Sequence, residues 1–238
     1  MNPDLYLRLR KKEGRLYSDE VVARLPDFPR GHPLTDEWHA RSASASRLTR
    51  SLTRQPKHLH ILDLGCGNGW LSSLISKSGH FVTGTDVNRL ELRQASRVFS
   101  SNPRLSFVEA EADFLPFKAK TFDLILLASV IQYFSDLPAL LRLLSGHLEP
   151  RGEIHILDSP LYADEELSDA AQRSRDYFSS LGFPEMAEHY FHHRFSSFGE
   201  FDYKFLYQPK AFWLRARRFL GQIDSPFPWI VVRAGEAG

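Results

Sequence analysis

The chain has a single cysteine, no long apolar run and almost no net charge. One cysteine, Cys66, excludes an intrachain disulfide bond and any metal site built from several cysteines. No apolar stretch approaches the roughly 18 residues of a membrane-spanning helix, and residues 1–15 lack the apolar segment of a secretory signal. Because the net charge is only +1, we expect neither nucleic acid nor an anionic membrane as a partner. We also expect a cytoplasmic location.

The composition is that of one soluble globular domain. The chain has 238 residues, of which 42% are hydrophobic and 25% charged, without internal repeats or low-complexity segments. Residues 8–15 form a charged stretch, and a proline-marked loop follows. A helix is predicted to begin at Thr35 or Asp36, either of which can cap it, because Trp38 and Leu48 then fall on the same face.

Strand-like and helix-like segments alternate in the middle of the chain. The expected strands are residues 59–64, 81–85, 105–108, 122–129 and 153–157, and the expected helices are 70–78, 88–100 and one that starts at Asp136. This alternation is typical of a parallel sheet with right-handed crossovers and helices on both faces. After a turn at 150–152 and a helix at 164–181, late strands at 201–207 and 229–233 are expected to add an antiparallel edge.

Three glycines on alternate positions follow the first of these strands. Residues 61–69 read Ile-Leu-Asp-Leu-Gly-Cys-Gly-Asn-Gly, so Gly65, Gly67 and Gly69 form a turn between a buried strand and a helix. Such a turn lets the backbone pass close to a ligand, because glycine has no Cβ. The dinucleotide fingerprint needs its third glycine where Trp70 stands, and no Gly-Lys-Ser/Thr of a phosphate-binding loop follows. An adenosine-type ligand therefore fits better than a pyrophosphate.

An acidic residue stands at the end of the second expected strand. Asp86 lies 21 residues after Gly65, where a carboxylate can accept hydrogen bonds from both hydroxyls of a ribose. The alternative is that Asp86 caps the helix that follows it. In combination with the glycine turn, the spacing favours the ribose contact.

Together these motifs resemble those of the class I S-adenosylmethionine-dependent methyltransferases. The matching segments are Asp-Leu-Gly-Cys-Gly-Asn-Gly at 63–69, Gly-Thr-Asp-Val at 84–87, Glu-Ala-Asp-Phe-Leu-Pro-Phe at 111–117, Phe-Asp-Leu-Ile-Leu-Leu-Ala-Ser at 122–129 and Leu-Glu-Pro-Arg-Gly-Glu at 148–153. Arg151 departs from the family, since it replaces the first glycine of an L-x-P-G-G turn. The resemblance implies an α/β fold, a three-layer Rossmann-like methyltransferase sandwich with a mostly parallel seven-stranded sheet and an antiparallel last strand. Residues 1–56 would then be an N-terminal helical lid and residues 57–238 the cofactor-binding domain, with an insert at about 160–200.

The resemblance also implies which residues hold S-adenosylmethionine. The cofactor-binding candidates are Asp63, Gly65, Cys66, Gly67, Asp86, Val87, Asp113, Phe114, Ser129 and Gln132. Asp63 would hold the loop or reach the ligand's ammonium, and Asp86 would take the ribose hydroxyls. Val87 would pack on adenine, Asp113 would accept from its amino group, and Phe114 would supply a backbone donor and an apolar edge.

The chemistry of methyl transfer makes few demands on the protein. It is an in-line displacement with a neutral leaving group, so positioning and the exclusion of water can supply much of the catalysis. A base is needed only for a hydroxyl, an acidic carbon or a protonated amine. The catalytic candidates are Tyr133, after the fourth strand, with His189 and His192 in the insert. These histidines lack a reliable ligand spacing, so no metal is expected.

Two basic features allow more than one interpretation. Arg41 either pairs with the carboxylate of the ligand or is a simple exposed helix residue. The segment that carries Lys210, Arg215, Arg217 and Arg218 could dock on an anionic acceptor, a carrier protein or a membrane surface. Because the run is short, we favour an amphipathic helix that packs on the sheet and keeps its basic residues in water.

We therefore expect a methyltransferase that uses S-adenosylmethionine, releases S-adenosylhomocysteine and acts on a small-molecule acceptor as a monomer or homodimer. The alternative is a non-catalytic domain that binds S-adenosylmethionine as a sensor or scaffold. A Rossmann oxidoreductase is disfavoured by Trp70, and a domain that binds no nucleotide is the third possibility. The acceptor is expected to contact residues 1–56 and 158–220, where the family pattern ends.

Overall fold

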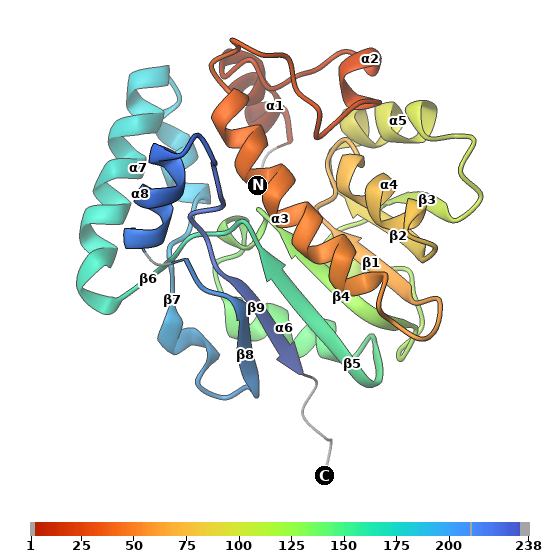
Figure 1. Ribbon diagram of the computed structural model, residues 1–238. Coiled ribbons are helices and arrows are strands. Elements are labelled where there is room, and N and C mark those ends of the chain that lie inside the picture. Colours follow the sequence, from red (N-terminus) through yellow and green to blue (C-terminus); the bar gives the residue numbers. More distant parts are fainter. Residues whose placement is uncertain (1–2, 210, 234–238) are drawn as a thin grey trace.

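A seven-stranded sheet forms the centre of the protein, as seen in a computed structural model that describes residues 3–209 and 211–233. The strand order is β3-β2-β1-β4-β5-β9-β8 (Figure 1). The strands are β1 (His60–Leu64), β2 (Phe81–Asp86), β3 (Leu105–Glu109), β4 (Phe122–Ala128), β5 (Leu148–Leu157), β8 (Tyr203–Tyr207) and β9 (Trp229–Arg233). Strands β1 to β5 are mutually parallel, and β9 is antiparallel to both β5 and β8. The predicted sheet is confirmed.

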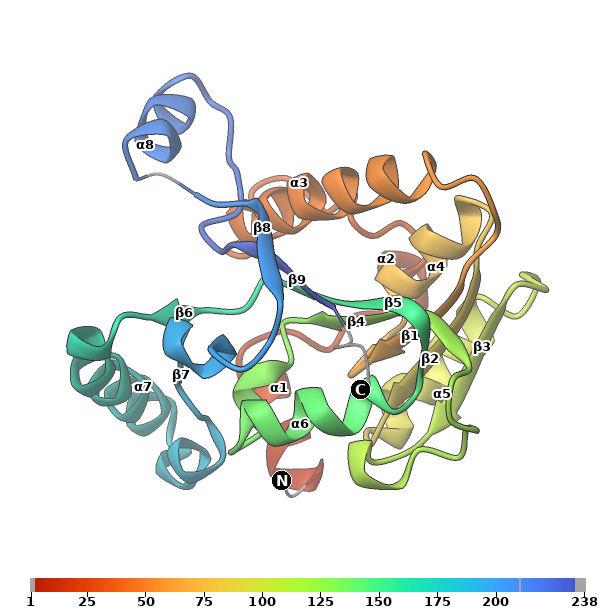
Figure 2. The ribbon, with the colours of Figure 1, turned by 90° about the horizontal axis from the view of Figure 1, so that it is seen from below.

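Helices cover both faces of this sheet and extend past one end of it. The helices are α1 (Pro3–Lys12), α2 (Asp19–Val22), α3 (Thr35–Leu52), α4 (Trp70–Lys77), α5 (Arg89–Val98), α6 (Leu137–Ser145), α7 (Leu167–Leu181) and α8 (Ala211–Phe219). Helices α3 and α4 lie on one face and α6 on the other, which gives the three layers (Figure 2). A small second sheet, β6 (Leu161–Tyr162) with β7 (His193–Arg194), was not predicted. Within the described ranges, no helix is both long and apolar enough to cross a membrane.

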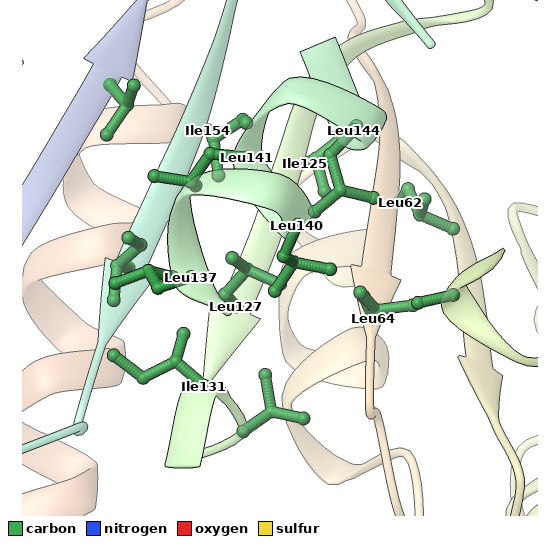
Figure 3. Packing of buried hydrophobic residues seen from close by; sticks show 14 of the residues in the cluster. Leu62, Leu64, Ile125, Leu127, Ile131, Leu137, Leu140, Leu141, Leu144 and Ile154 are labelled. Atoms are coloured by element: carbon green, nitrogen blue, oxygen red, sulfur yellow. The ribbon is translucent and has the colours of Figure 1, made fainter. Parts of the chain in front are cut away.

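Alternate residues of the central strands supply two hydrophobic cores. Leu62, Ile125 and Leu127 point to one face, where the leucines of α6 cover them (Figure 3). Ile61 and Leu126 point to the other face and pack with α3 and α4. This division follows from the two-residue period of a strand. Each large apolar side chain buried in this way contributes about 1.5–3 kcal/mol, so both helical layers are needed to cover the sheet.

The charged stretch at 8–15 belongs largely to a helix that was not predicted. In α1, Leu5 and Leu9 are buried and pack with Phe178 and Phe183 in a third, smaller cluster. Only these two apolar positions mark the buried side of α1, and the charged residues around them hide the pattern. The beginning of the chain is therefore held against the insert that contains α7.

Two local predictions differ from the structure at turns and caps. Helix α3 follows Leu34 without a side-chain cap, because the Thr35 hydroxyl donates back to the His32 carbonyl at 2.7 Å. Residues 150–152 lie inside β5 rather than in a separate turn, where the pairing with β4 is irregular and Arg151 has a φ of 71°. The predicted start of a helix at Asp136 is confirmed: Asp136 is the N-cap of α6, and its side chain accepts from the Ala139 backbone N–H.

Helix α8 contradicts the expectation that its apolar side packs on the sheet. Phe212 and Trp213 are exposed, as are Phe219 at the end of the helix and Leu220 after it. The sequence pattern is amphipathic in either case, and only the tertiary placement decides whether water or the sheet meets the apolar side. Lys210, which the same prediction included, lies outside the described residues.

Candidate active site

A cavity of about 870 Å³ opens at the carboxyl ends of the parallel strands. The residues that follow β1, β2, β3, β4 and β5 all contribute to its wall, including Gly65, Val87, Ala110, Ser129 and Asp158. The outer wall comes from the start of the chain, from α3, and from the insert that contains α7. In open α/β sheets ligands bind in this position.

The three glycines of the turn have different neighbours. A Cβ added to Gly65 would lie 2.3 Å from Cγ2 of Val130, and one added to Gly69 would lie 2.5 Å from Cζ of Phe107. Both positions therefore need glycine for packing within the protein, and both have positive φ. A Cβ added to Gly67 would meet nothing closer than 3.7 Å. Since Gly67 also lines the cavity, it is the glycine whose backbone is open to a ligand.

Asp86 borders the cavity and organises the glycine turn. Its Oδ2 accepts from the Gly67 backbone N–H and its Oδ1 from that of Asn88, each at 2.8 Å. Each carboxylate oxygen keeps a second lone pair for a ligand hydroxyl. Burial raises the pKa of Asp86 above its usual value. Helix α5 is capped by Asn88, whose side chain accepts from its first-turn N–H groups, so the interpretation of Asp86 as the cap is wrong.

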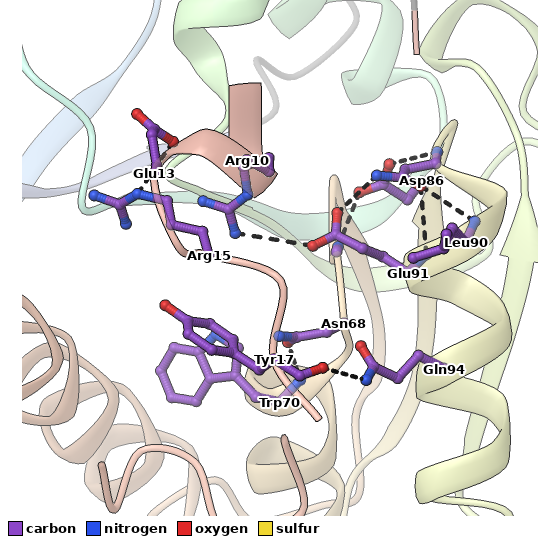
Figure 4. A network of polar contacts seen from close by, with 12 residues as sticks. Arg10, Glu13, Arg15, Tyr17, Asn68, Trp70, Asp86, Leu90, Glu91 and Gln94 are labelled. Atoms are coloured by element: carbon purple, nitrogen blue, oxygen red, sulfur yellow. Dashed lines mark hydrogen bonds and ion pairs between the residues drawn. The ribbon is translucent and has the colours of Figure 1, made fainter. Parts of the chain in front are cut away.

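Two residues that were not predicted, Glu91 and Arg10, stand beside Asp86 (Figure 4). Glu91 accepts from the Asn88 side-chain amide at 2.9 Å and lies 3.8 Å from an Arg10 Nη2 atom. Burial raises the pKa of Glu91 to about 7, against the opposing effect of Arg10. Arg10 Nε is buried and has no hydrogen-bond partner within the described chain. The place of Glu91 three residues after a cap was a weak signal for it, whereas nothing local singles out Arg10.

Two further predicted residues, Asp63 in β1 and Gln132 after β4, also line the cavity. Asp63 is buried and accepts from the Ser72 hydroxyl at 2.5 Å, and burial raises its pKa to about 6. Gln132 donates through Nε2 to the Ser129 carbonyl at 2.7 Å. Its Oε1 is buried and finds no partner among residues 3–209 and 211–233. An unpaired buried acceptor at a cavity wall is suited to a ligand donor.

The predicted adenine-side residues divide into those on the wall and one outside it. Val87 and Asp113 line the cavity, as does Cys66, whose thiol pKa is raised by burial. Phe114 does not line the cavity, and its side chain is 78% exposed. Phe114 lies in the 3-10 turn Ala112–Phe114 with its side chain directed outward, and its predicted roles as a backbone donor and an apolar edge stay predictions.

A polar network at the mouth joins three separate elements. Arg15 donates to both carboxylate oxygens of Glu37 at 2.6 Å, and Arg41 donates to Glu37 at 3.0 Å. Glu13 pairs with Arg15 and accepts from the Tyr177 hydroxyl at 2.5 Å. Although burial opposes its charge, these arginines hold the pKa of Glu37 at about 2. These contacts link the segment after α1, which contains Glu13 and Arg15, to helices α3 and α7 across the cavity mouth.

Aromatic rings form the outer wall beside the catalytic candidates. Tyr133 makes edge-to-face contacts with Tyr6 and Tyr190, with ring centroids 5.8 and 6.1 Å apart. Burial raises the pKa of Tyr133, so its hydroxyl stays neutral. His189 lines the cavity, whereas His192 lies behind the wall and shares a 2.9 Å hydrogen bond with Ser174. Burial lowers the pKa of His192, which favours the neutral imidazole.

The described residues contain no group of three or more histidine, cysteine, aspartate or glutamate side chains placed to hold a metal ion.

The central part of the chain is similar to known methyltransferases. Residues 61–152 match a family model described as a methyltransferase domain. The malonyl-[acyl-carrier protein] O-methyltransferase of Erwinia pyrifoliae is 31% identical over 96 residues, which are 40% of this chain and 36% of that protein. The human mitochondrial arginine-hydroxylase NDUFAF5 is 36% identical over 110 residues, which are 45% of this chain and 31% of that protein. The chain therefore spans about a third of the length of these two relatives.

A solved structure shows the same fold over nearly the whole chain. It is a putative sarcosine dimethylglycine methyltransferase from Galdieria sulphuraria, with a TM-score of 0.57 and 16% identity, covering 98% of this chain and 99% of that chain. At this identity the likeness shows the fold alone. Residues 61–152 therefore carry a methyltransferase domain, and the strand order of the sheet around it is that of a Rossmann-like fold.

Proposed function

We propose that this protein transfers the methyl group of S-adenosylmethionine to a small-molecule acceptor. The observation that carries the proposal is one continuous cavity, which joins the cofactor candidates around Gly67 and Asp86 to an aromatic outer wall. Its volume of about 870 Å³ is within the usual range for ligand pockets and leaves space for two small molecules.

The residues on the inner wall fit the cofactor. Asp86 would hold the ribose hydroxyls, Val87 would pack on adenine and Asp113 would accept from its amino group. Asp63 and the unpaired Oε1 of Gln132 would face the ammonium end of the ligand. When bound, S-adenosylmethionine supplies an electrophilic methyl group on a sulfonium. Its positive charges suit a wall where three buried carboxyl groups, those of Asp63, Asp86 and Glu91, lie together.

The residues of the outer wall would orient the acceptor and exclude water. Tyr133 and Tyr190 have pKa values raised by burial, so each offers a neutral hydroxyl donor rather than a base. His189 is the candidate on the wall that can accept a proton from the acceptor. His192 would act only through Ser174, which places it as a positioning residue.

The outer wall also favours an acceptor with a flat apolar body and an anionic group. Phe178 and the tyrosines present ring faces and edges to the cavity. Arg173 lines the same wall, and no ion pair or hydrogen bond of its side chain is found in the described part of the chain. A carboxylate or phosphate on the acceptor would give this guanidinium a partner.

Binding of the cofactor is tested by calorimetric titration with S-adenosylmethionine and S-adenosylhomocysteine, with NAD and NADP as controls. Asp86→Asn should weaken binding by about 1–3 kcal/mol, because the ribose hydroxyls lose a charged acceptor. Asp176→Asn, an exposed carboxylate on α7, is the matched control and should leave affinity unchanged. Equal affinity of the Asp86 variant and the wild type would contradict the ribose contact.

Turnover distinguishes an enzyme from a sensor or scaffold. Pools of small metabolites are screened for release of S-adenosylhomocysteine from S-adenosylmethionine, and anionic aromatic compounds should be enriched among those that respond. Tight cofactor binding without turnover by any pool would favour the sensor. If Arg173→Gln leaves the release of S-adenosylhomocysteine with these acceptors unchanged, the acceptor does not need an anionic group.

A further inference from the structure

Helix α8 and Leu220, the residue after it, expose four large apolar side chains that the proposed function does not use. Phe212, Trp213, Phe219 and Leu220 are 74, 60, 92 and 72% exposed. Transfer of such side chains out of water is favourable. Contiguous exposed apolar residues mark interaction sites more often than single ones. The surface formed by Phe212, Trp213, Phe219 and Leu220 is therefore a candidate interaction site.

The exposed side chains share one side of the helix. At about 100° per residue, Phe212, Trp213, Ala216 and Phe219 fall within an arc of about 120°, and Leu220 continues it. Arg215 and Arg217 fall on the two borders of this arc. An apolar arc with aromatic residues and flanking arginines is the pattern of a helix that lies in the interface of a lipid bilayer.

Ion pairs connect the C-terminal half of α8 to the rest of the protein, and the apolar side chains of the arc stay exposed. Arg217 pairs with Asp224, which also pairs with Arg47 of α3 at 2.6 Å. Arg215 has no ion pair among residues 3–209 and 211–233 and keeps its charge for a partner. Figure 2 shows α8 standing apart from the sheet and from the helices that cover it.

These features decide between partners. A two-fold contact with a second copy would bring the same arc together and would place the unpaired Arg215 of both copies near one another. A bilayer with anionic headgroups accepts the aromatic rings at the acyl boundary and the arginine at the phosphates. We propose that α8 docks this protein on the surface of an anionic lipid bilayer. The near-zero charge of the whole chain does not oppose this, because screening limits attraction to charges within about 10 Å of the surface.

The distribution of tryptophan provides a direct measurement. Trp38, Trp70 and Trp229 are buried, with at most 9% exposure, so Trp213 supplies the solvent-exposed part of the fluorescence. Full-length protein is titrated with vesicles of phosphatidylcholine alone and of phosphatidylcholine with phosphatidylglycerol. Emission should shift to the blue and resist iodide quenching, with tighter binding to the anionic vesicles that weakens as salt is added. Unchanged emission and no co-sedimentation with either vesicle would overturn the proposal.

Substitutions identify the surface by co-sedimentation. The double change Phe212→Ser and Trp213→Ser should reduce vesicle binding by on the order of tenfold or more. Leu143→Ser, an exposed apolar residue on α6, is the matched control and should have no effect. Arg215→Glu should weaken binding to anionic vesicles by at least about fivefold, and Arg50→Glu on α3 should not.

Two results would assign the surface to another partner. If the double change separates a dimer in solution and leaves vesicle binding intact, the arc contacts a second copy and the proposal is overturned. If Leu143→Ser lowers binding as much as the double change, adsorption is general and the proposal is also overturned. The increase in the melting temperature of each variant on addition of S-adenosylhomocysteine is measured in parallel. It should be the same in all variants, so that a failure of membrane docking is distinguishable from a failure of cofactor binding.

Discussion

At the scale of single residues, the cavity gathers acids whose burial is unfavourable for charge. Asp86 is one of them, and burial raises the pKa values of Asp63 to about 6 and of Glu91 to about 7. The sequence marks Asp63 and Asp86 by their places at strand ends. Glu91 is found only when α5 is folded against the turn, because its side chain then lies beside Gly67.

The raised pKa of Glu91 predicts a pH-dependent effect on stability. A carboxyl group whose pKa is raised on folding holds its proton better in the folded state, so stability falls as pH rises from about 4.5 to above 7. Glu91→Gln should therefore raise the free energy of unfolding by about 1–3 kcal/mol near pH 8 and much less near pH 5. Urea unfolding at both pH values measures this.

Glu165→Gln, at an exposed position, serves as the control for that comparison. An increase of the same size at both pH values would show that titration of Glu91 is not the cause. A loss of stability near pH 8 would show that the attraction of Glu91 to Arg10 exceeds the effect of burial.

At the scale of elements, α1 and α7 meet over the cavity through few apolar contacts. Leu5 and Leu9 of α1 pack with Phe178 of α7 and with Phe183 and Met186 after it. The ion pairs of Arg15 then continue the contact to α3. A satellite cluster of this kind opens more readily than the sheet core, because it buries fewer apolar side chains.

Removal of one of these side chains should loosen α1 without unfolding the sheet. Leu9→Ala deletes a buried side chain and leaves a space beside Phe178. Limited trypsin digestion should cut the basic residues of α1 faster, and the affinity for S-adenosylhomocysteine should fall with it. Leu16→Ala, at a residue exposed to water, is the control. Cleavage at the wild-type rate would show that the polar network alone holds α1.

At the scale of the whole molecule, the two helical layers share one sheet. Trp38, Leu48 and Leu52 of α3 belong to the same core as Ile61 and Leu126 of the central strands. The predicted N-terminal extension, residues 1–56, therefore contains two kinds of structure. The segment from Tyr6 to Tyr17 contributes side chains to the cavity wall, whereas α3 both borders the cavity and covers the sheet.

This arrangement predicts that two N-terminal deletions behave differently. A chain that begins at residue 16 should fold with one cooperative thermal transition and bind the cofactor weakly, because the sheet keeps both layers. A chain that begins at residue 57 should fail to fold, because it exposes the face that Trp38 and Leu48 cover. Circular dichroism and calorimetry measure both. Cooperative folding of the shorter chain would place the domain boundary after α3.

The sequence predicts most of the sheet but only part of the candidate site. The strands, the caps at Asn88 and Asp136 and the glycine turn follow from local signals: period-two apolar residues, side chains that bind their own backbone, and positions without a Cβ. Phe114 shows the limit, since the direction of its side chain, which is exposed after the 3-10 turn, could not be read from its motif. Arg10 shows it as well, because no local pattern distinguishes it from the other basic residues of α1.

The sequence by itself determined the fold class, the methyltransferase domain at 61–152 and the inner wall of the cavity, because each depends on residues that are close in the chain. Only the tertiary structure decided which distant side chains form the outer wall. It brought Tyr6, Tyr133 and Tyr190 into contact and joined Arg15 to Glu37. It also decided that the apolar side of α8 meets water. The physical reason is that an amphipathic pattern specifies which side of a helix is apolar, whereas the packing of the rest of the chain decides whether that side meets protein or water.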